Sequence, residues 1–315
     1  MIDFRYHLIS LIAVILALAL GIIVGSGFLG GPLLDRLESD VDDLSKENAQ
    51  RLERIDELES SVAQGDAFAR IVGDYLLDET LAGVKVVVFQ FEESDGQVVG
   101  NIKREIEAAG GQISAEITLS EKFELGTQPT ADELALALGS VEMKPEELRI
   151  EAATVLGERS AAAAVETVGS DSPTGAAAER FNETVNSLER SEFVGVRAED
   201  DGRTIPQGAS FVVIGGDDDA AGYEPSGFAV ALVEALGDRG APTVVVEPFR
   251  STWALVTSIR QDVEARGAAS TIDNGETTIG QIGTVLALAQ AQGGEIGHFG
   301  FGAGRTGPIP PPPAP

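Results

Sequence analysis

The chain has 315 residues, of which 43% are hydrophobic, and its 51 acidic and 22 basic side chains give a formal net charge of −29. So acidic a protein repels phosphate backbones and anionic lipid headgroups, which excludes the nucleic-acid-binding classes. There is no cysteine, and there are only two methionines and two histidines, so disulfides, thiolate metal sites and cysteine nucleophiles are excluded and ligands for soft metal ions are scarce.

The first feature along the chain is an uncharged, mostly apolar run that starts at Leu8 and meets no charged residue until Asp35. About 20 apolar residues cross a bilayer as a helix, so residues 8–30 are predicted to be a transmembrane anchor. Residues 1–7 contain Arg5 and the terminal amine, whereas acidic residues dominate after the run. Because positive flanks stay inside, we expect a single-pass protein of the cell membrane, with residues 1–7 cytoplasmic and the body extracytoplasmic.

A cleaved signal peptide is the alternative to an anchor. Signal peptides have an apolar region of about 7 to 15 residues that ends in small residues, and Ala17 and Ala19 fit such a site. The apolar run nevertheless continues through residues 20–24, and the acidic Asp3 is unusual in a signal peptide. These two observations favour an anchor that is not cleaved.

Residues 34–64 have the residue spacing of a coiled-coil stalk. Apolar residues recur in the 4–3 pattern over about four heptads, which is the length that indicates a coiled coil. Val and Ile at position a with Leu at d favour two parallel strands, and a lone Asn at a fixes their register. Arg51 interrupts one d position, and a single amphipathic helix packed on the body is the alternative. The predicted homodimer seam consists of Leu34, Leu37, Val41, Leu44, Asn48, Ile55, Leu58 and Val62.

Residues 66–300 are predicted to form an extracytoplasmic α/β domain. The apolar runs at 84–91 and 210–216 are typical of buried parallel strands, and the alternation of strands with helices predicts a mainly parallel sheet. Residues 301–315 are rich in glycine and proline and are predicted to be a disordered tail. Further strands are expected at 112–119, 193–196 and 243–249, and helices at 96–109, 130–168 in two parts, 178–192, 228–236, 258–265 and 277–290.

Two places contain candidate metal ligands. Asp217, Asp218 and Asp219 directly follow a predicted strand, where loops line ligand crevices, and carboxylates hold hard cations such as Ca²⁺ or Mg²⁺. His298 lies in the segment GHFGFG, where an imidazole can ligate a metal, donate a hydrogen bond or sit at an interface. The simpler interpretations, which the sequence favours, are an acidic loop in a very acidic protein and a structural histidine in a tight turn.

The sequence lacks three common catalytic motifs. It has no GxSxG elbow, no Walker A motif and no HExxH motif, and His298 is the only histidine in the body. We therefore expect a protein that is not an enzyme and that binds no cofactor.

The order of four features is characteristic over nearly the whole chain: an anchor that ends in GSGF, a coiled coil, the strand KVVVF and the late segment GHFGFG. Together they resemble the actinobacterial family named for the mycobacterial copper transport protein B. The resemblance implies a role in copper homeostasis, as an envelope or outer-membrane channel, with copper as the transported ion. His298 and Gly300 match the family's late histidine-glycine segment, and the run 302–304 stands where a further histidine is expected.

The same resemblance implies a second role. A corynebacterial relative looks like the partner of a protein that acts in cell separation, where the pair regulates a peptidoglycan hydrolase. One helix cannot enclose a pore, so a channel would require several chains. The sequence therefore leaves two functions open: a component of copper transport, and a non-enzymatic coiled-coil scaffold that binds a cell-envelope protein.

Overall fold

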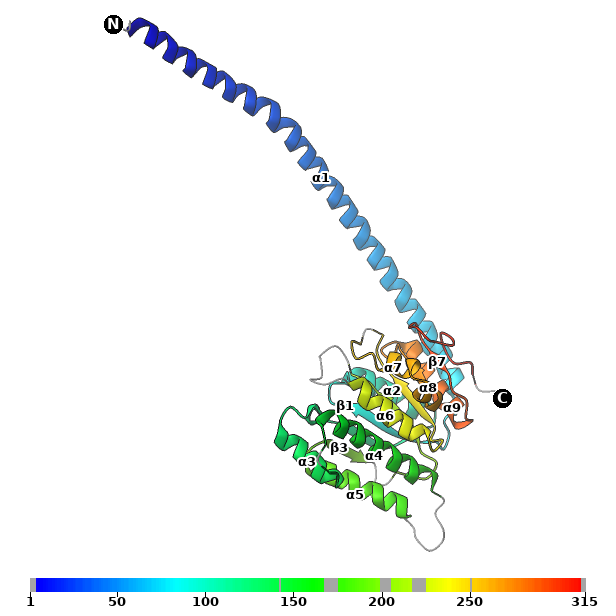
Figure 1. Ribbon diagram of the computed structural model, residues 1–315. Coiled ribbons are helices and arrows are strands. Elements are labelled where there is room, and N and C mark those ends of the chain that lie inside the picture. The colour runs from blue at the N-terminus through cyan, green and yellow to red at the C-terminus, as the bar shows by residue number, and fades with distance from the viewer. Residues whose placement is uncertain are drawn as a thin grey trace. The chain divides into compact units, whose positions relative to one another are not determined.

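The computed structural model describes residues 4–141, 143–166, 175–198, 205–216, 225–249 and 251–312 (Figure 1). By the contacts between their Cα atoms, the residues form two compact units, Met1–Gly65 and Asp66–Pro315. The first helix, α1 (Phe4–Leu77), begins in the first unit and ends in the second.

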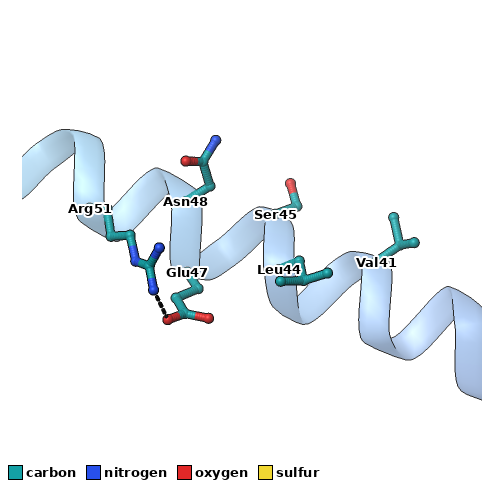
Figure 2. Close-up of a pocket in the computed structure, with 6 residues that line it drawn as sticks. All are labelled: Val41, Leu44, Ser45, Glu47, Asn48 and Arg51. Atoms are coloured by element: carbon teal, nitrogen blue, oxygen red, sulfur yellow. Dashed lines mark hydrogen bonds and ion pairs between the residues drawn. The ribbon is translucent and has the colours of Figure 1, made fainter.

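In the first unit the structure describes one long helix with an apolar beginning. The stretch Phe4–Gly25 has 22 residues, a mean hydropathy of 3.0 and no buried residue. Among the described residues it is the one helix long and apolar enough to cross a membrane, and a helix satisfies its own backbone polar groups, as a bilayer requires. The predicted N-terminal apolar helix is thus confirmed and fits a membrane anchor. Farther along, Val41, Leu44 and Asn48 project from the same helix (Figure 2).

The second unit is built on a sheet that has the strand order β3-β2-β1-β4-β5-β6-β7 within the described ranges. All neighbouring strands are parallel except β2 and β3, which confirms the prediction of an α/β body with a mainly parallel sheet. The strands β2 and β3 are added on one side of β1, and the strands from β4 onward are added on its other side. The order of strands therefore changes direction between the parallel neighbours β1 and β4, as in doubly wound folds. The strands are β1 (Lys85–Phe91), β2 (Gln112–Leu119), β3 (Val194–Ala198), β4 (Ser210–Ile214), β5 (Thr243–Val246), β6 (Ser270–Ile272) and β7 (His298–Phe299).

Helices cover both faces of this sheet. The end of α1 shares one apolar cluster with α2 and α9, and α3 to α8 contribute to the cluster on the other face. After α1, the helices of the described chain are α2 (Gly96–Ala108), η1 (Glu121–Glu124), α3 (Gln128–Leu138), α4 (Pro145–Val165), α5 (Ala176–Arg190), α6 (Pro225–Gly237), α7 (Leu255–Gln261), α8 (Val263–Ala268) and α9 (Thr278–Gln292).

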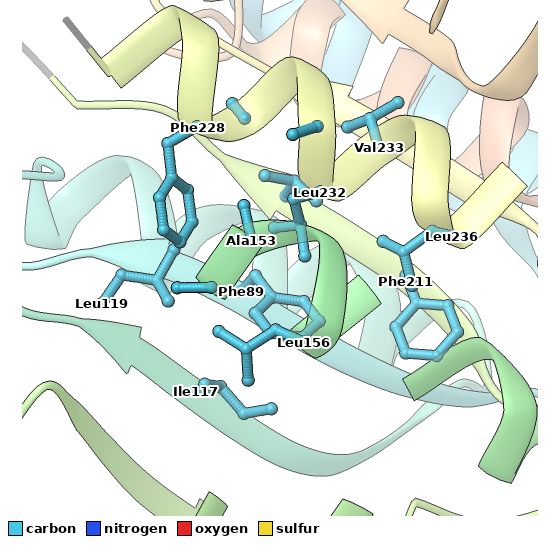
Figure 3. Close-up of a cluster of buried hydrophobic side chains, with 14 of the residues drawn as sticks. Phe89, Ile117, Leu119, Ala153, Leu156, Phe211, Phe228, Leu232, Val233 and Leu236 are labelled. Atoms are coloured by element: carbon cyan, nitrogen blue, oxygen red, sulfur yellow. The ribbon is translucent and has the colours of Figure 1, made fainter. Parts of the chain in front are cut away.

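The strand residues divide between the two faces because successive side chains of a strand point to opposite sides. On β1, Val87 and Phe89 join the cluster under α4 and α6, whereas Val86 and Val88 join the cluster under α2 and α9. Figure 3 shows Phe89 among Leu156 of α4 and Leu232 of α6. An apolar run without alternation is therefore what this strand requires, since both of its faces are buried.

Several elements differ from the prediction. The strands β6 and β7 were not expected, and the helix expected at 258–265 is two helices, α7 and α8. Asp262 separates them because its backbone is extended and its Oδ1 accepts hydrogen bonds from the N–H groups of Glu264 and Ala265, at 2.8 and 3.0 Å. A side chain that caps a new helix in this way ends the preceding one.

Part of the segment 301–315, for which disorder was predicted, contacts the body. Pro310 is buried, and Ile309 packs against the apolar cluster under α9. The Gln290 side chain donates a hydrogen bond to the Pro311 carbonyl oxygen at 2.8 Å. Residues 309–311 are thus attached to α9 by apolar and polar contacts.

Helices α4 and α6 lie side by side (Figure 1), and their close approach predicts opposite effects of two Gly→Ala substitutions. A Cβ at Gly157 would lie 2.7 Å from the Leu232 carbonyl oxygen, whereas a Cβ at Gly100 in α2 would meet nothing within 4 Å. We expect Gly157→Ala to lower the free energy of unfolding by about 1–3 kcal/mol through overpacking. Gly100→Ala should raise it by about 0.5–1 kcal/mol, because alanine is the better helix former.

Urea unfolding of the full-length protein in detergent, followed by the fluorescence of its only tryptophan, measures both effects. That residue, Trp253, is only 5% exposed and edge-on to Phe91, so it reports on the body. Two shifts of the same sign would contradict the close crossing of α4 and α6.

Candidate functional site

The predicted dimer seam forms an exposed apolar stripe on α1. Its described apolar side chains are between 47% and 65% exposed in the single chain. Around Val41 and Leu44 they line a shallow pocket of about 440 Å³ together with Asn48 (Figure 2). The coiled coil itself stays a prediction, and the side chain of Leu34 lies outside the described residues. The apolar members are Leu37, Val41, Leu44, Ile55, Leu58 and Val62.

The interruption of the seam at Arg51 has a local partner. Its Nη2 donates to Glu47 Oε1 at 2.7 Å, one turn back on the same helix (Figure 2). In the same way Arg54 Nη1 donates to Glu57 Oε2 at 2.9 Å. Exposed pairs of this kind contribute only a few tenths of a kcal/mol, but they hold the guanidinium groups along the helix rather than across the stripe.

In the body, a cluster of polar side chains lies where strands β6 and β7 end, and the buried Arg260 of α7 is its centre. Arg260 Nη1 pairs with Asp273 Oδ2 at 2.5 Å, Nε donates to Thr271 Oγ1 at 2.8 Å, and Nη2 donates to the Phe299 carbonyl oxygen at 2.7 Å. The guanidinium therefore joins α7, β6 and β7. A buried cation costs free energy unless it is paired and hydrogen-bonded in this way.

The Asp273 carboxylate fixes the chain that follows β7. It accepts hydrogen bonds from the backbone N–H groups of Phe301 and Gly302, at 2.6 and 2.7 Å. Gly300, which lies between β7 and Phe301, has φ +122°, and a Cβ at this position would overlap the Asp273 carboxylate. Only glycine suits that position, because the backbone adopts a left-handed conformation in close contact with a side chain.

His298 lies in β7 and is buried next to this ion pair. Its Nδ1 is 3.0 Å from Thr271 Oγ1, and its backbone N–H donates to Thr306 Oγ1 at 3.0 Å. Burial and, to a smaller extent, the positive charges of Arg260 and Arg266 together lower the pKa of the imidazole to about 4. The ring is therefore neutral near pH 7 and takes part in a structural network.

The metal sites proposed from the sequence remain predictions. Asp217, Asp218 and Asp219 lie outside the described residues. In the part of the chain that the structure describes, no group of three or more His, Cys, Asp or Glu side chains is placed to hold a metal ion. His298 is described, and its Nδ1 contacts the Thr271 hydroxyl rather than a carboxylate.

Sequence reasoning missed the residues that organise this cluster. Arg260 and Asp273 are 13 positions apart, on different elements, so no local spacing connects them. Another buried carboxylate, Glu247, also went unnoticed: its two oxygens accept from the N–H groups of Leu255 and Val256, at 2.9 Å each. Burial raises the pKa of Glu247. The one signal in the sequence was the glycine-rich run 300–307, which indicates close packing of backbone against side chains.

The family model and the known proteins that are similar to this chain all carry the same family name. A family model described as copper transport outer membrane protein, MctB, matches residues 1–310. Proteins named copper transporter MctB from Mycobacterium bovis and Mycobacterium tuberculosis are 28% identical over 315 residues, which covers 96% of this chain and 98% of theirs. The protein of that name from Mycobacterium leprae is 26% identical over 325 residues, with 97% and 98% covered.

The buried imidazole predicts a specific pH dependence of stability. The folded protein holds His298 with a pKa of about 4, against an ordinary value of 6.5. Between these values the unfolded chain binds the additional proton, so stability is lost as the pH falls. The slope attributable to His298 should approach about 1.4 kcal/mol per pH unit.

His298→Asn removes the titrating imidazole, whatever its effect on stability at pH 7. Between pH 6.5 and pH 4, the slope of the free energy of unfolding against pH should therefore fall by about 1.4 kcal/mol per pH unit. Urea unfolding of both proteins at a series of pH values, read from Trp253 fluorescence, measures the difference in slope. Parallel curves would mean that the folded protein accepts the proton as readily as the unfolded chain.

Proposed function

Because the chain belongs to the MctB family of copper transport outer membrane proteins, we propose that it is a membrane-anchored protein of the cell envelope that acts in copper homeostasis. The observation that carries this proposal is the family match over residues 1–310, which includes the apolar helix, the stalk and the α/β body. The names of the mycobacterial relatives support copper as the ion concerned.

Copper is proposed as the transported ion and not as a resident cofactor. The chain has no cysteine, two methionines and two histidines, and copper(I) prefers thiolate and thioether ligands whereas copper(II) prefers imidazole. One apolar helix cannot enclose a pore, so movement of the ion requires several chains or a further membrane protein. We propose no catalytic role.

The proposed arrangement in the membrane follows from the ends of the apolar helix. An uncleaved anchor would keep residues 1–7 in the cytoplasm and the body outside the cell membrane, because Arg5 and the terminal amine precede the helix and positive flanks stay inside. The description of the family as outer membrane proteins supports the other location, in the outer membrane. In either membrane, the exposed stripe on α1 would pair two chains as a parallel coiled-coil dimer.

The exposed stripe also supports a second candidate function. A parallel coiled coil that carries a folded body is suited to recruit or activate an envelope enzyme, and a peptidoglycan hydrolase of cell separation is the partner class that the family resemblance implies. Here the protein would be a non-enzymatic scaffold. Copper handling and cell separation can be measured in the same strain.

Deletion of the gene tests both functions. For the copper role we expect a several-fold rise in cellular copper, measured by mass spectrometry after growth with added copper, and restoration by the full-length chain. A double variant of the stripe, Leu44→Asp with Ile55→Asp, should fail to restore it. Lys46→Glu, which changes the charge equally at an outer heptad position, should restore it.

Normal copper content in the deletion strain, together with chained cells that fail to separate, would reject the copper role and support the scaffold. If both measurements stay normal, neither function stands. Rescue by the stripe variant would show that pairing of the stalks is not needed.

The absence of cysteine allows a direct test of the proposed dimer. In a parallel, in-register coiled coil, identical d positions face each other within disulfide range. Leu44→Cys should therefore form a disulfide-linked dimer under mild oxidation in membranes, detected on a non-reducing gel. Glu53→Cys, on the outer side of the heptad, is the matched control and should stay monomeric. Equal cross-linking at both positions would indicate random collision rather than a coiled coil.

A further inference from the structure

The body has a groove between helix α3 and the start of α4, called here the α3–α4 groove. It has a volume of about 550 Å³. Its lining is partly apolar and partly polar: the apolar members are Ala131, Ala135, Leu136, Met143 and Leu148, and the polar members are Gln128, Asp132 and Ser140. Nothing in the copper role or in the stalk dimer uses this surface.

Leu136 is the most exposed apolar side chain of the groove. Helix α3 buries Ala131 and Leu134 against the body, and Leu136, two positions after Leu134, is turned away from that face and is 83% exposed. Isolated exposed leucines are common, but this one lines a groove together with other apolar side chains. Such a combination suits the insertion of an apolar side chain from a partner.

The walls of the groove are held in place by polar contacts. The hydroxyl of Ser140 donates to Glu151 Oε1 at 2.8 Å and so connects the segment after α3 to α4. Within α3 itself, Gln128 Nε2 donates to Asp132 Oδ1, one turn along the same helix, at 2.8 Å. A partner would therefore meet a surface that is largely ordered beforehand, which reduces the entropy lost on binding.

The charge around the groove selects the partner. The described residues of the segment 121–151 carry seven carboxylates and three cationic side chains, a net charge of −4. All three cations have partners: Lys122 pairs with Glu133 at 2.8 Å, Lys144 lies 3.7 Å from Glu147, and Arg149 Nη1 donates to the Glu124 carbonyl oxygen at 3.0 Å. A second copy of the same acidic surface is repelled, and so is an anionic lipid surface.

We propose that the α3–α4 groove binds a basic amphipathic segment of a partner protein. A helix that presents apolar anchors on one face fits such a groove, with an anchor beside Leu136 and lysine or arginine side chains towards Asp132 and the other carboxylates of this segment. The interaction surface is independent of copper, and it would serve the envelope protein under either proposed function.

A fluorescent helical peptide tests this proposal. The probe has roughly 18 residues, about five turns, with leucines on one face and lysines on the other. It is titrated against the full-length protein in nanodiscs of zwitterionic lipid, and anisotropy is recorded. We expect saturable binding that weakens between about 50 and 500 mM salt, as screening requires. A peptide with glutamate in place of lysine should not bind, and the signal from empty nanodiscs, into whose interface an amphipathic helix also partitions, is subtracted.

Two matched variants separate the groove from general attraction to an acidic protein. Leu136→Asp adds a negative charge yet removes the apolar contact, so the probe should bind about tenfold more weakly or worse. Val263→Asp adds the same charge at an apolar side chain of α8 that is 86% exposed, and it should leave binding unchanged or slightly stronger.

Several results would overturn the proposal. Equal affinities of the two variants would assign the binding to overall charge, and binding of the acidic peptide would refute the charge argument. If Leu136→Asp changes the sedimentation of the protein without any peptide, a second copy covers the groove instead. Unchanged circular dichroism and unfolding of both variants establish that each result concerns the surface and not the fold.

Discussion

The exposure of the apolar start of α1 is the constraint on which the rest depends. Over Phe4–Gly25 no residue is buried, and leaving a large apolar side chain in water rather than in an apolar environment costs about 1.5–3 kcal/mol. For a stretch that consists mostly of Leu, Ile, Val and Ala, the sum exceeds the whole stability of an ordinary domain. A lipid interior is the solvent that removes this penalty, and a helix is the conformation that lipid permits.

The α/β body follows a second constraint, which is that both faces of a parallel sheet must be covered. Helices on each side of the sheet satisfy this constraint. The chain also occupies part of the edge formed by the carboxyl ends of the strands, where doubly wound folds commonly bind ligands. At the ends of β6 and β7 the edge is filled by the chain's own last segment, which Arg260 and Asp273 hold in position. Since buried ion pairs are weak contributors to stability, fixing one conformation of that segment is the better account of this pair.

How far the sequence predicted this structure depends on whether the signal was local. The strand β1 and the helix α2 were predicted to within one residue, because their sequence signals are local; in the structure, the side chain of Asp95 caps the start of α2. The strands β6 and β7 were missed: they have three and two residues and exist through pairing with distant parts of the chain. The candidate site shows the same division, since His298 was singled out by its sequence context whereas Arg260 and Asp273 meet only in the fold.

Charge and apolar area together explain why two acidic copies would pair through the stalk and not through the α3–α4 groove. Residues 34–64 carry ten carboxylates and four cations, so two parallel stalks repel each other, but exposed like charges interact by only tenths of a kcal/mol per pair. Against this, each stalk offers a seam of large apolar side chains, each of which contributes about 1.5–3 kcal/mol if fully buried. The groove offers a single exposed leucine in its lining, too little to offset the repulsion between two copies. An opposite charge on the partner is therefore what would make that smaller surface bind.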